Sequence, residues 1–247
     1  MAKERLDKIL LDRRLAPSRE RAKALIMAGQ VVVDDHLADK AGQMVAVDAE
    51  IRLKGEVLPF VSRGGLKLQK ALDEFAIDVT GLVVMDVGAS TGGFTDCLLQ
   101  RGAAKVIAVD VGYGQLAWKL RQDERVINLE KTNIRYLEQE KLGEVPQMAV
   151  IDASFISLDK VLPPVLNLIS PSAVVVALIK PQFEVGRGEV GKGGVVRDVK
   201  KHAEVISVIT ALALDLKLKV KGITESPILG PKGNREFLIY LSKPGNE

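Results

Sequence analysis

The stretch "VVMDVGASTGGF", residues 83–94, decides how most of the chain folds. Its apolar start, which runs into Asp86, is typical of a buried strand, and Gly88, Gly92 and Gly93 form a glycine-rich turn before a helical pattern. A strand, a glycine turn and a helix in this order bring helix amides and closely approaching backbone against a ligand. The stretch therefore predicts a sheet domain with a nucleoside-containing ligand on the turn.

The spacing of the glycines narrows the choice of ligand. A dinucleotide site has the pattern G-x-G-x-x-G, but this turn reads D-x-G-x-x-x-G-G and holds Ser90 where the second glycine would admit a pyrophosphate. The next predicted strand ends at Asp110, where a carboxylate accepts the hydroxyl groups of a ribose, and Asp86 suits an amino group. These features favour S-adenosylmethionine over NAD, with a turn that binds no ligand as the plain alternative.

The predicted cofactor-binding residues lie on the turn, at the end of the next strand and at one position farther along the chain. They are Asp86, Gly88, Ala89, Ser90, Thr91, Gly92, Gly93, Phe94, Asp110, Val111 and Asn133.

Helix-like and strand-like segments alternate from Gly65 onward. Helical patterns occur in "LKLQKALDEF" and "GGFTDCLLQRG", and apolar strands in "LVVMDV", "KVIAVDV", "MAVID", "AVVVALIK", "KVKGITES" and "EFLIYLS". Apolar strands between helices predict an α/β fold, a Rossmann-like, doubly wound sheet that helices cover on both faces.

A smaller module precedes this region. "RLDKILLDRRL" and "LAPSRERAKALIMAGQ" predict two helices, and "QVVVDD", "MVAV" and "EIRLK" predict three short strands. "GEVLPFVSRGG", residues 55–65, breaks the pattern with glycine and proline. We therefore expect a small α+β domain over residues 1–56, a linker over 57–64 and the α/β domain over 65–247.

Charge is unevenly distributed along the chain. The 247 residues carry a net charge of only +3, too little on its own to indicate a nucleic-acid partner. Residues 1–24, however, hold eight Lys or Arg against four Asp or Glu, which predicts a basic face on the first two helices. The single cysteine, the lack of a secretory pattern and the absence of an apolar run of about 20 residues predict a cytoplasmic protein without a membrane partner.

Four charged residues stand where predicted strands or helices of the second domain begin or end: Lys67, Asp152, Lys180 and Glu236. Ligands bind outside the carboxyl ends of parallel strands, so Asp152 and Lys180 should face the site of the glycine turn. Glu236 joins them only if the last strand is antiparallel. A neutral lysine is able to take the proton of an alcohol during methyl transfer, with carboxylates orienting the amine. Two ordinary ion pairs on the rim of a sheet would leave the same pattern. His36 and His202 alone do not make a usual zinc site, so we expect no metal.

The order Lys67, Asp152, Lys180, Glu236 resembles the K-D-K-E tetrad of FtsJ-type ribose 2′-O-methyltransferases, and "MDVGASTGGFTD" resembles their cofactor loop. The whole chain is similar to the hemolysin A (TlyA) family, through "SRERAKALIMAGQVVVD", "VSRGGLKL", "LIKPQFEVGRGEVGKGGVVRD" and "GPKGNREF". The linker departs from that family at Pro59–Phe60, where other members commonly carry a tryptophan.

The resemblance implies an S4-type RNA-binding domain followed by a class I methyltransferase domain. It implies 2′-O-methylation of ribosomal RNA, often at cytidine, on free RNA or ribosomal subunits. Lys180 is then the base, Asp152 and Glu236 orient it, and Lys67 assists and holds the substrate. We expect RNA contacts from Arg5, Lys8, Arg13, Ser18, Arg19, Arg21 and Lys23.

Three other functions stay open. "DASF", residues 152–155, stands where base N-methyltransferases have a D/N-P-P-Y motif, but both prolines are missing. The hemolysin name suggests a membrane-active protein, and loss of catalysis would leave an RNA chaperone. The long connection from Phe183 to Lys200 is glycine-rich, and we expect a mobile flap that becomes ordered over RNA.

Overall fold

The computed structural model describes residues 3–34, 36–54, 58–186, 188–191 and 193–245. The chain divides into two compact units, Met1–Leu58 and Pro59–Glu247. Residues 59–64, which we expected in the linker, belong to the second unit, where Phe60 is buried in the core. The rest of the expected linker falls on residue 57, outside the described residues, and on Leu58.

The first unit packs two helices against short strands. It contains β1 (Lys3–Arg5), α1 (Leu6–Asp12), α2 (Arg19–Met27), β2 (Val31–Val33), β3 (His36–Ala38), β4 (Met44–Ala46) and β5 (Ile51–Leu53). β2 lies between β3 and β5, and β1 pairs with β4. The sequence did not predict β1 and β3, because strands of three residues are too short to show a periodic pattern. The Ser18 hydroxyl caps α2 by accepting the Arg21 amide.

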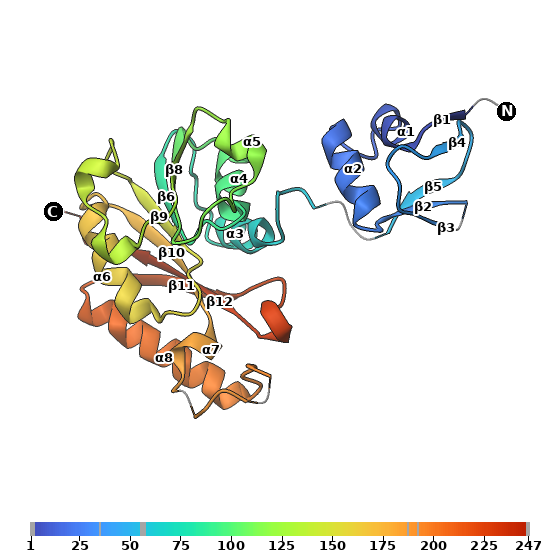
Figure 1. Ribbon diagram of the computed structural model, residues 1–247. Helices are drawn as coiled ribbons and strands as arrows, with labels where there is room; N and C mark the ends of the chain where they lie inside the picture. The colour runs from blue at the N-terminus through green and yellow to red at the C-terminus, as the bar shows by residue number, and fades with distance from the viewer. Residues whose placement is uncertain (1–2, 35, 55–57, 187, 192, 246–247) are drawn as a thin grey trace. The chain divides into compact units, whose positions relative to one another are not determined.

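The second unit is built on one seven-stranded sheet (Figure 1). Its strands are β6 (Val83–Val87), β7 (Lys105–Val109), β8 (Val126–Leu129), β9 (Met148–Ile151), β10 (Val174–Ile179), β11 (Lys219–Glu225) and β12 (Phe237–Ser242), in the spatial order β11-β12-β10-β9-β6-β7-β8. All neighbours are parallel except those of β12. This confirms the predicted Rossmann-like α/β fold. β8 was not predicted, because its residues are only half-buried and give a weak apolar signal.

Helices cover both faces of this sheet (Figure 1). Those of the second unit are α3 (Gly64–Glu74), α4 (Gly93–Gln100), α5 (Trp118–Arg121), α6 (Leu158–Leu168), α7 (Pro181–Glu184) and α8 (Val199–Asp215). Val84 and Val150 pack on the face of α3 and α4, whereas Met85 and Ile151 pack on the face of α6 and α8. Burial of both faces explains why these strands read as continuous apolar runs.

The topology collects several chain segments at one edge of the sheet. β6, β7, β9 and β10 run in the same direction, so their carboxyl ends meet there. β12 is antiparallel to β10 and pairs Phe237 with Ile179, which places the start of β12 at that edge. The sheet order changes direction between β6 and β9, the position where α/β sheets bind ligands.

The glycine-rich connection after α7 differs from the expected flap. The Asn234 side chain donates to the Gly194 carbonyl over 2.9 Å and accepts the Val196 amide over 3.1 Å. Val196 is buried, and its carbonyl lies 2.8 Å from Nε2 of His202. Gly194 and Val196 are thus held against the domain by Asn234, whereas Arg187 and Lys192 of the same connection lie outside the described residues, and ordering of the connection over RNA stays a prediction.

Among the described residues, no helix is long and apolar enough to cross a membrane.

Candidate active site

The glycine turn is shaped by close backbone contact. Gly88 has φ +85°, a conformation that residues with a side chain rarely adopt, and a Cβ atom there would lie 2.8 Å from the Asp152 carbonyl oxygen. The Gly88 amide donates to the Val109 carbonyl over 2.8 Å. The turn after β6 is therefore wedged between the ends of β7 and β9, and only glycine fits at its first position.

Asp110 follows β7 and faces a cavity of about 450 Å³. Its two carboxylate oxygens accept the amides of Ser90 over 2.8 Å and Gly112 over 2.6 Å. These bonds fix the carboxylate while leaving further lone pairs for hydroxyl groups of a ligand. Val111 and Asn133 also line this cavity. A fixed carboxylate, a glycine that admits close backbone approach and apolar walls fit the nucleoside of S-adenosylmethionine.

Most of the predicted cofactor residues line a cavity. Gly88 and Ser90 line both the smaller cavity and a larger neighbouring one, and the larger cavity is also lined by Ala89, Thr91, Gly93 and Phe94.

Asp86 and Gly92 line neither cavity. Asp86 is fully buried and accepts the Thr95 hydroxyl over 2.7 Å, which ties β6 to α4. Gly92 has φ +93°, and a Cβ atom there would meet Leu120 at 2.3 Å. Both residues therefore support the turn, and the cofactor contact expected of them stays a prediction.

Burial raises the pKa of Asp86 to about 7, although the Thr95 hydrogen bond lowers it and neighbouring Asp152 raises it. A carboxyl whose pKa is higher in the folded than in the unfolded state stabilises fully below about pH 4, and this contribution is lost as the pH rises through about 7. Between about pH 5 and pH 8 the unfolding free energy of the wild type should fall by roughly 2–4 kcal/mol more than that of Asp86→Asn. Urea unfolding of both proteins at these two pH values tests this. An equal fall in unfolding free energy for the two proteins would contradict this prediction.

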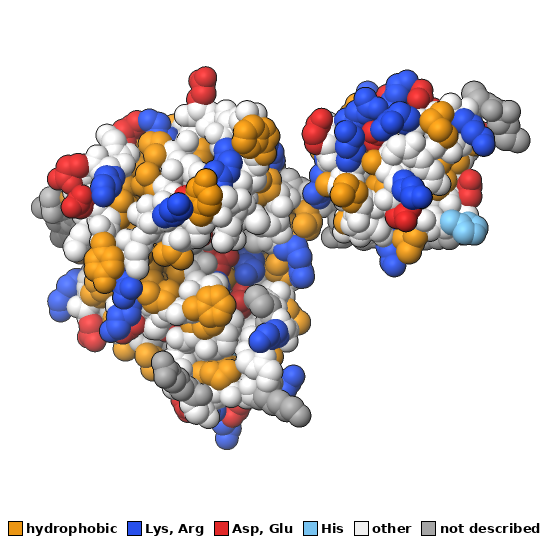
Figure 2. All heavy atoms as spheres, in the orientation of Figure 1, with side chains coloured by type: hydrophobic (Ala, Val, Ile, Leu, Met, Phe, Trp, Pro, Cys, Tyr) orange, Lys and Arg blue, Asp and Glu red, His pale blue; other side chains and the backbone are white. Residues whose placement is uncertain are grey.

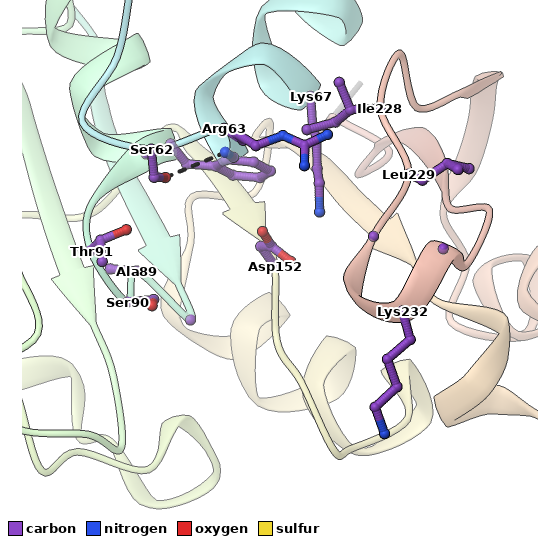
Figure 3. A pocket seen from close by; sticks show the side chains of 16 residues that line it. Ser62, Arg63, Lys67, Ala89, Ser90, Thr91, Asp152, Ile228, Leu229 and Lys232 are labelled. Atoms are coloured by element: carbon purple, nitrogen blue, oxygen red, sulfur yellow. Dashed lines mark hydrogen bonds between the residues drawn. The ribbon is translucent and has the colours of Figure 1, made fainter. Parts of the chain in front are cut away.

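The larger cavity, of about 650 Å³, adjoins the smaller one at the turn, and Figure 3 shows its lining. One wall is the start of α3 with Ser62, Arg63 and Lys67, and the floor is the turn and Asp152. The opposite wall is the loop between β11 and β12, residues 228–230 and 232–233. Because the two cavities share Gly88, Ser90 and Asp152, a ligand in one would be next to a ligand in the other.

The four charged residues predicted from separate parts of the chain form two buried ion pairs. Lys67 Nζ lies 2.6 Å from Glu236 Oε2, and Lys180 Nζ lies 2.6 Å from Asp152 Oδ1. Both lysines and Glu236 are buried. Among the described residues Glu236 forms its ion pair with Lys67 and not with Lys180, because β12 begins opposite α3, and a role of Glu236 in orienting Lys180 stays a prediction.

Lys180 has a further partner that the sequence did not reveal. Its Nζ donates to the Ser154 hydroxyl over 2.8 Å and to the Asp152 carbonyl over 3.2 Å. Asp152 and Ser154 thus hold the amine from one loop after β9. No motif marks Ser154 as a partner of Lys180, because a serine beside a strand end has no pattern of its own.

Glu236 is fixed from the side of the loop. A Cβ atom on Gly230 would lie 2.0 Å from Glu236 Oε1, so the loop packs tightly on this carboxylate only because Gly230 lacks a side chain. The Gly230 amide in turn donates to the Asn234 carbonyl over 2.8 Å.

The basic residues of the first unit differ in their partners. Figure 2 shows Lys and Arg side chains gathered over α1 and α2. Arg5 and Arg19 both donate to the buried carboxylate of Asp7, whose pKa these hydrogen bonds lower to about 2. Lys8 pairs with Glu4, and Arg13 donates to the carbonyls of residues 47 and 49. Within the described part of the chain, the side chains of Arg21 and Lys23 make no hydrogen bond or ion pair.

Comparisons with known proteins agree with this geometry. Residues 60–243 match the FtsJ-like methyltransferase family, and residues 4–51 match the S4 domain. The chain is 50% identical over 244 residues to a Bacillus subtilis protein described as "Putative rRNA methyltransferase YqxC", covering 98% of this chain and 87% of that one. It is 47% identical to the 16S/23S rRNA (cytidine-2′-O)-methyltransferase TlyA of Mycobacterium tuberculosis, covering 96% and 89% of the two chains.

A solved structure is also similar to this chain. The "Putative hemolysin from Streptococcus thermophilus" matches with a TM-score of 0.77 at 47% identity, covering 100% of this chain and 90% of that one. Two domains in the same order, matched over nearly their full length, place the protein in one family. The chain belongs to the hemolysin A (TlyA) family, in which an S4 domain precedes an FtsJ-like methyltransferase domain.

Proposed function

We propose that the chain transfers the methyl group of S-adenosylmethionine to the ribose 2′-hydroxyl of a nucleotide in ribosomal RNA, a cytidine as in the named relative. The observation that carries the proposal is the pair of buried ion pairs beside two adjoining cavities. The smaller cavity suits a nucleoside, and the larger one is open to a second nucleotide. S-adenosylmethionine would supply an electrophilic methyl group where the cavities meet.

In this proposal Lys180 removes the proton of the hydroxyl. Lys180 must be neutral before it accepts this proton, so its own proton first passes to Asp152 or to water. Asp152 and Ser154 hold Nζ in place at 2.6 and 2.8 Å, which limits the amine to one direction. Lys67, which lines the larger cavity and is oriented by Glu236, binds the sugar or its phosphate as a cation. Asp110, with Val111 and Asn133, holds the nucleoside of the cofactor.

The proposal is tested with labelled S-adenosylmethionine and ribosomal subunits from a strain that lacks this gene, followed by mapping of the modified nucleotide. Label on a 2′-oxygen supports it. Label on an exocyclic base nitrogen would favour the base N-methylation alternative, and absence of cofactor binding would favour a non-catalytic RNA chaperone. Lysis of red blood cells by cofactor-free protein would favour the membrane-active alternative.

The S4 unit is proposed to hold RNA through its basic face. Arg21 and Lys23 have no side-chain partner among the described residues, so both are available for phosphates. We expect Arg21→Gln with Lys23→Gln to lower the slope of log affinity for subunits against log salt concentration by about 0.7–0.9 per lost contact. Filter binding over a range of salt concentrations measures this slope.

A matched control is Lys40→Gln, which removes an exposed cation of the same unit outside α1 and α2. An equal fall in slope for both proteins would show that only the total charge matters. Arg13→Gln is a less useful variant, because loss of its bonds to two carbonyls also destabilises the unit.

A further inference from the structure

The larger cavity is lined by cations that have no role in the two ion pairs. Lys67 is neutralised by Glu236 and Lys180 by Asp152, so the four residues together carry no net charge. Arg63 and Lys232 also line the cavity, and within the described part of the chain neither side chain has a hydrogen bond or a carboxylate partner. Arg63 and Lys232 therefore add positive charge to a cavity whose four ion-paired residues carry none.

Arg63 and Lys232 stand on different walls. Arg63 immediately precedes α3, and Lys232 lies on the loop between β11 and β12 (Figure 3). Both are exposed. A nucleotide within RNA has one phosphate on each side of its ribose, so a ribose that reaches Lys180 from this cavity brings two phosphates to its rim. One cation on each of two walls of the cavity provides one ligand for each phosphate.

The backbone at Lys232 supports a function for its side chain. Lys232 has φ +59°, a left-handed conformation that glycine adopts at no cost and lysine does not. Glycine would be the easier residue in this turn, and Gly233 follows with φ +89°. Residues in such conformations cluster at ligand sites.

We propose that Arg63 and Lys232 bind the two phosphates that flank the target ribose, one from each wall of the larger cavity. The proposal rests on the proposed function and adds the residues that bind the substrate backbone. Arginine and lysine are the usual phosphate ligands in nucleic-acid complexes. Leu229, which is exposed on the same loop, leaves an apolar surface beside the sugar.

The test compares Arg63→Gln and Lys232→Gln with the wild type in two assays. Filter binding to ribosomal subunits should show the salt slope reduced by about 0.7–0.9 in each variant. Methylation should show KM for the subunits raised about tenfold and kcat within about threefold, since neither residue touches the reacting atoms. Affinity for S-adenosylmethionine should stay unchanged. Arg63→Lys and Lys232→Arg keep the charge and should restore most of the slope.

Lys217→Gln is the matched control. Lys217 is also an exposed lysine with positive φ, +62°, but it precedes β11 at the opposite edge of the sheet. Lys232→Gly suits the backbone and should lose affinity without loss of stability, which separates binding from folding. Wild-type slope and KM in both glutamine variants, or an equal effect of Lys217→Gln, would overturn the proposal. Failure of the wild type to methylate would refute the proposed function instead, because the binding slope is read without turnover.

Discussion

Lys180→Arg is expected to bind S-adenosylmethionine and ribosomal subunits like the wild type and to lose turnover by about 10²- to 10⁴-fold. Arginine keeps the positive charge opposite Asp152, so the partly buried carboxylate stays paired. Arginine does not lose its proton at accessible pH, and so it does not act as a base. Single-turnover methylation of subunits measures the rate, and calorimetry with the cofactor checks that the site is intact.

Two further variants test this prediction. Lys70→Arg makes the same substitution in an exposed ion pair of α3 with Glu74 and should keep full turnover. Lys180→Ala should regain part of its turnover when small primary amines are added, because they fit the space left by the side chain. Near-normal turnover of Lys180→Arg would show that Lys180 positions the ribose and does not take the proton.

Asp110→Ala is expected to weaken binding of S-adenosylmethionine by about 10- to 150-fold, since a hydrogen bond to a charged group contributes about 1.5–3 kcal/mol. The carboxylate lines the nucleoside cavity and is already fixed by the Ser90 and Gly112 amides, so it binds hydroxyl groups without reorganisation. Isothermal titration with the cofactor and with its demethylated product measures the effect. Asp110→Asn keeps one acceptor oxygen and should lose less.

Asp123→Ala is the matched control for this substitution. Asp123 also accepts the amide of the residue two positions later, Arg125, over 3.0 Å, but it lines no cavity found in the described part of the chain. Its removal should change stability slightly and cofactor affinity not at all. If Asp110→Ala binds the cofactor as tightly as Asp123→Ala does, the ribose lies elsewhere.

The sheet was predictable from the sequence because its strands are buried on both faces and read as apolar runs between helices. The site edge was predictable for the same reason: Asp110, Asp152 and Lys180 directly follow such runs. β8 and the three-residue strands β1 and β3 were not predictable, since half-buried or very short strands show no period.

Partners of charged residues were much harder to predict than positions. The sequence places Glu236 at the start of β12, but only the order of strands in the sheet puts it opposite Lys67. Likewise, a count of basic residues does not reveal that Arg5 and Arg19 share Asp7, which leaves other cations for RNA. The anchoring of Gly194 by Asn234 spans 40 positions in the chain, a separation at which no local pattern acts.

The two buried ion pairs also restrict how this site is able to evolve. Loss of one partner leaves an uncompensated charge that is largely removed from water, which costs several kcal/mol, whereas replacement of both partners by apolar residues is far less harmful to folding. Lys67 and Glu236 are therefore expected to change together in evolution, and so are Lys180 and Asp152. A family member that no longer catalyses methyl transfer is expected to have lost both residues of a pair. Members with one intact pair and one lost pair would therefore belong to lineages without methyltransferase activity.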